Sequence, residues 1–92
     1  MKSKIYYLKG IRQEEGEDVI NWIEKSWNLF KDKGNYFELY ISESRFDELI
    51  RDLHYHNVYF DLNGFLTLIN LKIKRIVDKT EERIICINQK EV

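Results

Sequence analysis

The dipeptide Asn63-Gly64 constrains the fold of this chain more than any other pair of residues, because it separates two runs of β-forming residues. A two-residue hairpin loop of type I′ needs a positive φ angle at both central positions, which asparagine and glycine adopt most easily. The sequence therefore predicts a β-hairpin over residues 58–70. Apolar side chains fall on both of its faces, so we expect the hairpin to lie in the middle of a sheet.

Four further stretches have the pattern of β-strands. Residues 3–9 carry apolar groups on both faces, whereas residues 36–41 alternate between an apolar inner face and an outer face with two tyrosines. Residues 71–77 and 83–88 flank the polar segment DKTEE, and their isoleucine and valine content predicts a second hairpin. Residues 66–77 also fit a helical stripe, which would change the topology, but a helix would point two leucines to solvent.

Two helices are predicted from apolar periodicity. Residues 17–33 place apolar and polar side chains on opposite sides, and Gly34 follows where a glycine can cap the helix C-terminus. Residues 44–54 carry a narrower apolar stripe, and Ser42 or Ser44 can cap the N-terminus. Both helices have one apolar side, so we expect both to cover the sheet.

These elements predict an α+β fold, a single mostly antiparallel sheet with two helices in the order β-α-β-α-β-β-β. The 92 residues form one domain, residues 1–92, that can bury a core. No apolar run approaches the roughly 20 residues of a membrane span, and the N-terminus lacks a signal-peptide pattern. The one cysteine, Cys86, lies in an apolar run and cannot form an internal disulfide. We therefore expect a cytoplasmic protein with a buried thiol.

The only pair with metal-ligand spacing is His54 and His56, which share a face only if this stretch is a strand. The triplet His-Tyr-His resembles the His-hydrophobe-His motif of the HUH single-strand endonucleases. In that family a nucleophilic tyrosine lies on a helix after the histidines, and here no tyrosine follows Tyr59. The resemblance therefore does not extend to the chemistry.

Sequence motifs for catalysis are missing from the chain. It has no glycine-rich phosphate loop, no paired cysteines and no G-x-S-x-G motif. Nothing in the sequence brings two carboxylates together for acid–base chemistry. We therefore expect no enzymatic activity, no cofactor and no metal site.

Nucleic-acid binding is the alternative function. The net charge of −1 gives no support for it over the whole chain, so such binding must be local. Lys72, Lys74 and Arg75, with Arg83 across the predicted second hairpin, would form a basic β-ribbon able to follow a phosphate backbone. The lysines equally suit a protected sheet edge, and the acidic residues of the hairpin tip would repel phosphate.

The first helix motivates the preferred function, which is binding to another protein. Its apolar arc spans about 180°, more than the stripe of about 100° that packing against one sheet requires. Trp22 and Leu29 extend the arc on one side, and Ile20 and Trp27 extend it on the other. We expect Trp22 and Leu29 to be partly exposed, because charged residues border that side and can form a polar rim.

Further candidate partner-binding residues are two tyrosines on the outer face of the predicted strand 36–41 and a group of acids near the first helix: Tyr36, Tyr40, Glu14, Glu15 and Glu17. The acids could steer a basic partner, although acids also stabilise a helix N-terminus. The sequence thus predicts a small non-enzymatic protein-binding module that captures a target or associates with itself. Inhibitors and adaptors of viruses and mobile elements are often of this kind.

Overall fold

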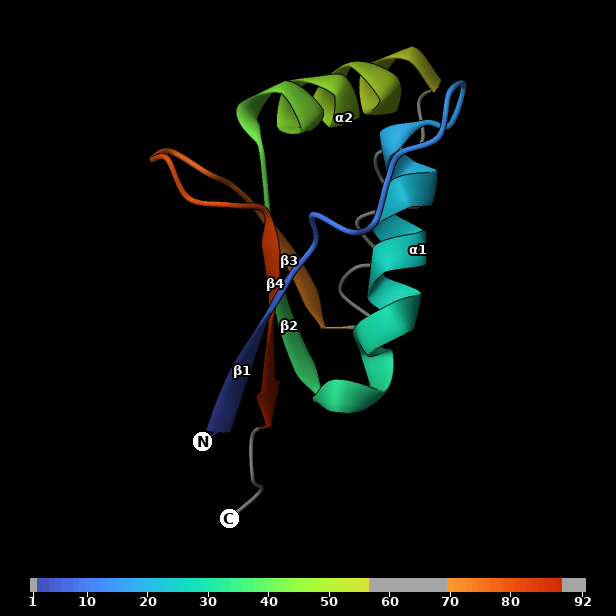
Figure 1. Ribbon diagram of the computed structural model, residues 1–92. Helices are drawn as coiled ribbons and strands as arrows, with labels where there is room; N and C mark the ends of the chain where they lie inside the picture. Colours follow the sequence, from blue (N-terminus) through green and yellow to red (C-terminus); the bar gives the residue numbers. More distant parts are fainter. Residues whose placement is uncertain (1, 57–69, 89–92) are drawn as a thin grey trace.

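The computed structural model describes residues 2–56 and 70–88 and has an α+β fold, as predicted (Figure 1). The described strands form one sheet in the order β1-β4-β2-β3. β4 is antiparallel to both of its neighbours, whereas β2 and β3 are parallel. Along the chain the elements are β1 (Lys2–Tyr7), α1 (Val19–Phe30), a 3₁₀ turn (Lys31–Lys33), β2 (Tyr36–Ile41), α2 (Glu43–His56), β3 (Leu71–Arg75) and β4 (Arg83–Asn88).

The predicted strands are confirmed where the structure describes them, with β2 and β4 matching their predicted bounds and β1 and β3 differing at their ends. The predicted hairpin over residues 58–70 lies outside the described residues, apart from Asn70, whose φ angle is 56°. The helix alternative for residues 66–77 is wrong for the residues that form β3. Local residue pattern was therefore sufficient to locate these strands.

The predicted second hairpin is wrong, because β3 and β4 do not pair with each other. β2 lies between them, with Leu39 opposite Ile73 of β3 on one side and Ile84 of β4 on the other. Parallel strands need a long crossover connection, and α2 lies in the connection from β2 to β3. The sequence shows which residues favour strands, but their pairing depends on where this crossover places β3.

The first helix is shorter than predicted at both ends. It begins at Val19, because the Asp18 side chain accepts a hydrogen bond from the Asn21 backbone N–H at 3.0 Å and caps the N-terminus. After Phe30 the chain tightens into the 3₁₀ turn. At α2 the cap is Ser42, whose hydroxyl accepts the Arg45 backbone N–H at 3.3 Å, so one of the two predicted caps is confirmed.

Gly34 does not have the predicted role of a left-handed C-cap. Its φ and ψ angles are −174° and −179°, which any residue can adopt. A side chain at this position would instead collide with β4, since a Cβ atom built there lies 3.0 Å from both the backbone N and O of Ile87. Glycine is therefore required for the close approach of two backbone segments.

The core lies between the helices and one face of the sheet. Figure 1 shows α1 alongside that face and α2 across one end of it. The thiol of Cys86 is buried there, as predicted, and burial raises its pKa. Buried apolar side chains come from both helices, from β2, β3 and β4, and from the residue after β1: Leu8, Val19, Trp22, Ile23, Phe37, Leu39, Ile41, Leu49, Leu71, Ile84 and Cys86.

Neither helix that the structure describes has the length and apolar character needed to span a bilayer.

Replacing Gly34 with alanine tests the close approach to β4. We expect Gly34→Ala to lower the free energy of unfolding by about 1–3 kcal/mol, because the new methyl group forces two backbone segments apart. Gly10→Ala is the matched control, since a Cβ atom at Gly10 meets nothing within 4 Å. Urea unfolding should show a change within about 0.5 kcal/mol for the control. Equal stability of the two variants would contradict the assigned role.

Candidate protein-binding surface

Trp22 is fully buried, so the expectation that it is partly exposed is wrong. Its indole N–H donates a hydrogen bond to the Ile11 backbone oxygen at 2.8 Å. The guanidinium carbon of Arg45 lies 3.8 Å from the centroid of its ring. The loop before α1 and a side chain of α2 therefore cover this margin of α1. Leu29, one residue before the end of α1, is 58% exposed as expected.

Arg45 ties together three segments that are distant in sequence. Besides covering Trp22, its Nε atom donates to Gln13 Oε1 at 3.1 Å, and its Nη1 atom forms an ion pair with Glu82. The other carboxylate oxygen of Glu82 accepts the Ser42 backbone N–H at 2.9 Å. These residues therefore hold the tertiary structure together and are not available to a partner.

Glu17, one of the predicted acidic binding residues, is engaged within the protein. Its carboxylate lies 2.9 Å from Lys25 Nζ and accepts the Glu14 backbone N–H at 3.0 Å. The hydrogen bond from Lys25 is the main cause that lowers the pKa of Glu17. Glu17 thus fastens the loop to α1, whereas Glu14 and Glu15 are exposed.

The face of the sheet opposite the helices is the surface that best fits a binding role, and we call it the open face. Strand residues alternate between the two faces, so the register assigns every second residue to it. Both helices lie on the other side of the sheet (Figure 1). The open face consists of Ser3, Ile5, Tyr7, Tyr36, Glu38, Tyr40, Lys72, Lys74, Arg83, Ile85 and Ile87.

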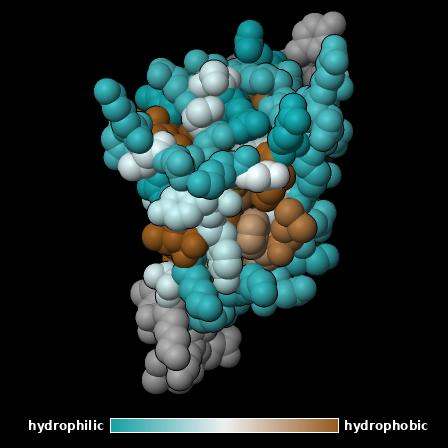
Figure 2. Space-filling view, viewed as in Figure 1, coloured by the Kyte–Doolittle hydropathy of each residue, from teal (hydrophilic) through white to brown (hydrophobic). Residues whose placement is uncertain are grey.

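Apolar and aromatic side chains are accessible on the open face. On β1, Ile5 is 51% exposed and Tyr7 is 55% exposed. Tyr36 and Tyr40 are half-buried on β2, as predicted for its outer side. Figure 2 shows hydrophobic surface around β1 and on the C-terminal part of α1, surrounded by hydrophilic regions.

Aromatic and cationic residues alternate across one row of the open face. The register aligns Tyr7, Arg83, Tyr40 and Lys74 on successive strands. The Arg83 guanidinium carbon lies 4.4 Å from the Tyr40 ring centroid, and Lys74 Nζ lies 5.6 Å from it. Such contacts hold cations over the ring. Lys74 also lies 2.6 Å from a carboxylate oxygen of Glu38, and this hydrogen bond is the main cause that raises the pKa of Lys74.

The four predicted nucleic-acid-binding residues do not form one ribbon. Lys72, Lys74 and Arg83 share the open face, but β2 separates β3 from β4. Arg75 belongs to the other face and lies 3.8 Å from Glu43.

The sequence analysis did not identify Ile5 and Tyr7 as candidate binding residues. The predicted strand 3–9 has apolar residues on both faces, and nothing in its pattern shows which face the helices leave uncovered.

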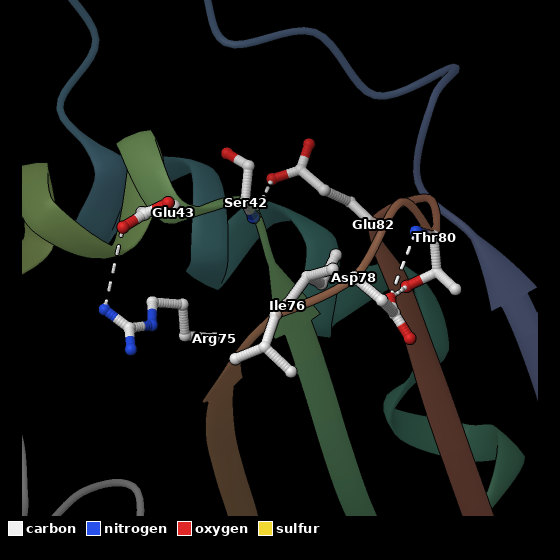
Figure 3. A pocket seen from close by; sticks show the side chains of 8 residues that line it. Ser42, Glu43, Arg75, Ile76, Asp78, Thr80 and Glu82 are labelled. Carbon is white, nitrogen blue, oxygen red and sulfur yellow. Dashed lines mark hydrogen bonds and ion pairs between the residues drawn. The ribbon is translucent and has the colours of Figure 1, made fainter.

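A surface cavity of 420 Å³ lies where β2 meets α2 and where the chain connects β3 to β4 (Figure 3). Glu82 is bonded to the Ser42 backbone N–H. Asp78 accepts hydrogen bonds from Thr80, at 3.1 Å from the backbone nitrogen and 2.5 Å from the hydroxyl. The carboxylates of Asp78 and Glu82 in this cavity are therefore already engaged by other groups of the protein.

His54 and His56 lie within α2, so the alternative in which they share the face of a strand is wrong. Elsewhere in the described ranges, no three His, Cys, Asp or Glu side chains gather as a metal site.

Comparison with protein-family models, with curated proteins and with solved structures finds no match for this chain.

Serine substitutions at Trp22 and Leu29 test which of these two side chains of α1 belongs to the core and which lies on the surface. We expect Trp22→Ser to lower the free energy of unfolding by about 3–5 kcal/mol, because it removes a fully buried ring and leaves a cavity. Leu29→Ser should change it by no more than about 0.5 kcal/mol, since that side chain is largely exposed. Thermal and urea unfolding followed by circular dichroism measure both. A stable Trp22→Ser variant would show that the ring does not support the core.

Proposed function

We propose that this protein is a non-enzymatic binding module that recognises another protein through the open face of its sheet. The observation that carries the proposal is the accessible apolar and aromatic surface on the side of the sheet that the helices leave uncovered. Ile5 and Tyr7 are more than half exposed there, although β1 belongs to the same sheet as the core strands. Exposed apolar patches of this kind are typical of interaction sites.

The arrangement of residue types on the open face supports a protein partner. Ile5 and Ile85 lie opposite each other in the register, and Tyr7 and Arg83 form the neighbouring pair. Aromatic residues and arginine are enriched at the centres of protein interfaces, whereas lysine and glutamate are depleted there. The lysines and Glu38 lie toward the β3 side of the face, where they can form a polar rim.

The biological role that we propose is that of an inhibitor or adaptor acting in the cytoplasm, of the type encoded by viruses and mobile elements. The chain lacks proline and alanine, a composition in keeping with an AT-rich genome. A buried, unpaired Cys86 suits a reducing compartment. Exposed Glu14 and Glu15 could attract a basic partner from a distance, which would raise the association rate more than the affinity.

Tyr36→Asp tests the open face as the binding surface. We expect it to weaken capture of the partner at least about tenfold, equivalent to 1.4 kcal/mol, because a carboxylate would be desolvated in an apolar interface. Leu29→Asp is the matched control, as Leu29 lies on α1, on the other side of the sheet. The measurement is quantitative pull-down from host lysate, with bound proteins identified by mass spectrometry. Loss of capture only with Leu29→Asp would place the interface on α1.

Single-stranded nucleic acid is the second candidate ligand, and the row Tyr7, Arg83, Tyr40 and Lys74 is the observation that favours it. Sheet faces that bind single strands combine aromatic rings, on which bases stack, with cations near the phosphates. Lys72 adds an exposed cation to this face. The ion pair between Lys74 and Glu38 and the cations already placed over Tyr40 weaken this candidate relative to a protein partner.

Lys72 and Arg75 provide a matched pair for testing this candidate, because both are exposed on β3 but belong to opposite faces. If nucleic acid binds the open face, Lys72→Glu should weaken binding and Arg75→Glu should have little effect. Fluorescence anisotropy of a labelled oligonucleotide, titrated at several salt concentrations, measures both, and the affinity should fall as salt rises. A lack of binding by the wild-type protein at low salt would eliminate this candidate.

A further inference from the structure

β1 and β3 are the two edges of the described sheet. A sheet edge presents unpaired backbone N–H and C=O groups, which can pair with a strand of another chain. Natural proteins usually protect an edge with charge, a bulge or a covering element. The two edges of this protein differ in how far they are protected.

The hydrogen bonds of β1 show which of its backbone groups face β4 and which point outward from the edge. The Leu8 N–H donates to the Glu82 oxygen at 3.0 Å, in register with the pairing of β1 and β4. Because an antiparallel strand directs the backbone groups of alternate residues to the same side, Lys4 and Tyr6 also face β4. The N–H and C=O groups of Ser3, Ile5 and Tyr7 therefore point outward from the edge.

The edge of β3 is protected by charge. Hydrogen bonds from the Phe37 N–H to the Asn70 oxygen and from the Ile76 N–H to the Ile41 oxygen, both at 2.9 Å, join it to β2. Its sequence, LKIKR, contains three cations in five residues. Two copies of this strand brought together would repel each other. In β1, by contrast, the residues with outward backbone groups are all uncharged.

We propose that β1 pairs antiparallel with β1 of a second copy of this chain, joining two sheets across a two-fold axis. Centred on Ile5, this pairing places Ile5 opposite Ile5 of the second copy and Ser3 opposite its Tyr7. All of these are residues whose backbone groups point outward from the edge, so each pair can exchange two backbone hydrogen bonds. The same register places Lys4 opposite Tyr6 of the second copy, and no lysine faces another.

The charges and the exposed surface favour a second copy as the occupant. A net charge of −1 produces little repulsion between two identical chains. A two-fold axis makes the surface self-complementary, so no separate partner strand is required. The pairing would also remove water from the exposed side chains of Ile5 and Tyr7 and make the open face continuous across both copies. This inference goes beyond the proposed function and fails independently of it, because a monomer could still bind a partner through Tyr36.

Light scattering and sedimentation of the purified full chain at increasing concentrations test the proposal. We expect the wild-type mass to approach twice 11.3 kDa, whereas Ile5→Lys should remain at 11.3 kDa because it sets two cations together at the axis. Leu29→Lys is the matched control, with a similarly exposed side chain at 58% on α1, and should dimerise like the wild type.

Ile5→Pro tests the backbone pairing itself and serves as the second variant if Ile5→Lys fails to fold. Its missing N–H points away from β4, so the sheet should remain intact while the dimer is lost. Circular dichroism verifies the fold of each variant. The proposal is overturned if the wild-type protein stays at 11.3 kDa up to about millimolar concentration. The same conclusion holds if the monomer captures only an extended peptide at this edge. A dimer that survives both Ile5 substitutions, or that Leu29→Lys alone dissociates, also overturns it.

Discussion

The packing of the Arg45 guanidinium against the buried ring of Trp22 is the interaction on which the rest of this structure depends. Trp22 anchors the loop before α1 through the Ile11 oxygen, and Arg45 links α2 to Gln13 and Glu82. A partly buried arginine is stable only when its charge and donors are satisfied, and here a carboxylate, an amide oxygen and an aromatic face satisfy them. This one side chain thereby fixes α1, α2 and the connection between β3 and β4 relative to one another.

With both helices held in this way, the two faces of the sheet have different uses. The inner face of the sheet packs into the core, in which Leu39, Ile41 and Ile84 are fully buried. The open face retains aromatic and apolar side chains that a stable monomer does not need to expose. The polar groups of the cavity near α2 are engaged within the protein, whereas the open face and the β1 edge present groups that a partner could contact.

The candidate site was only partly predictable. Strict alternation in β2 identified Tyr36 and Tyr40 as outward-facing, because a strand has a period of two residues. The wide apolar arc of α1 correctly indicated more apolar surface than one sheet can cover. The periodicity of α1 does not show which margin of its apolar arc stays exposed. Trp22 is covered by a residue of α2 and by the loop before α1, and helical periodicity does not specify the path of that loop. The same reasoning explains why Ile5 and Tyr7 were missed.

The sequence by itself determined the location of the described helices and strands, because side-chain periodicity and capping residues such as Asp18 and Ser42 act over a few neighbouring positions. Only the tertiary structure decided that β2 lies between β3 and β4, and that Gly34 serves a close approach to Ile87 and not a helix cap. Strand pairing and face coverage depend on contacts between residues far apart in the chain, which a local pattern does not specify.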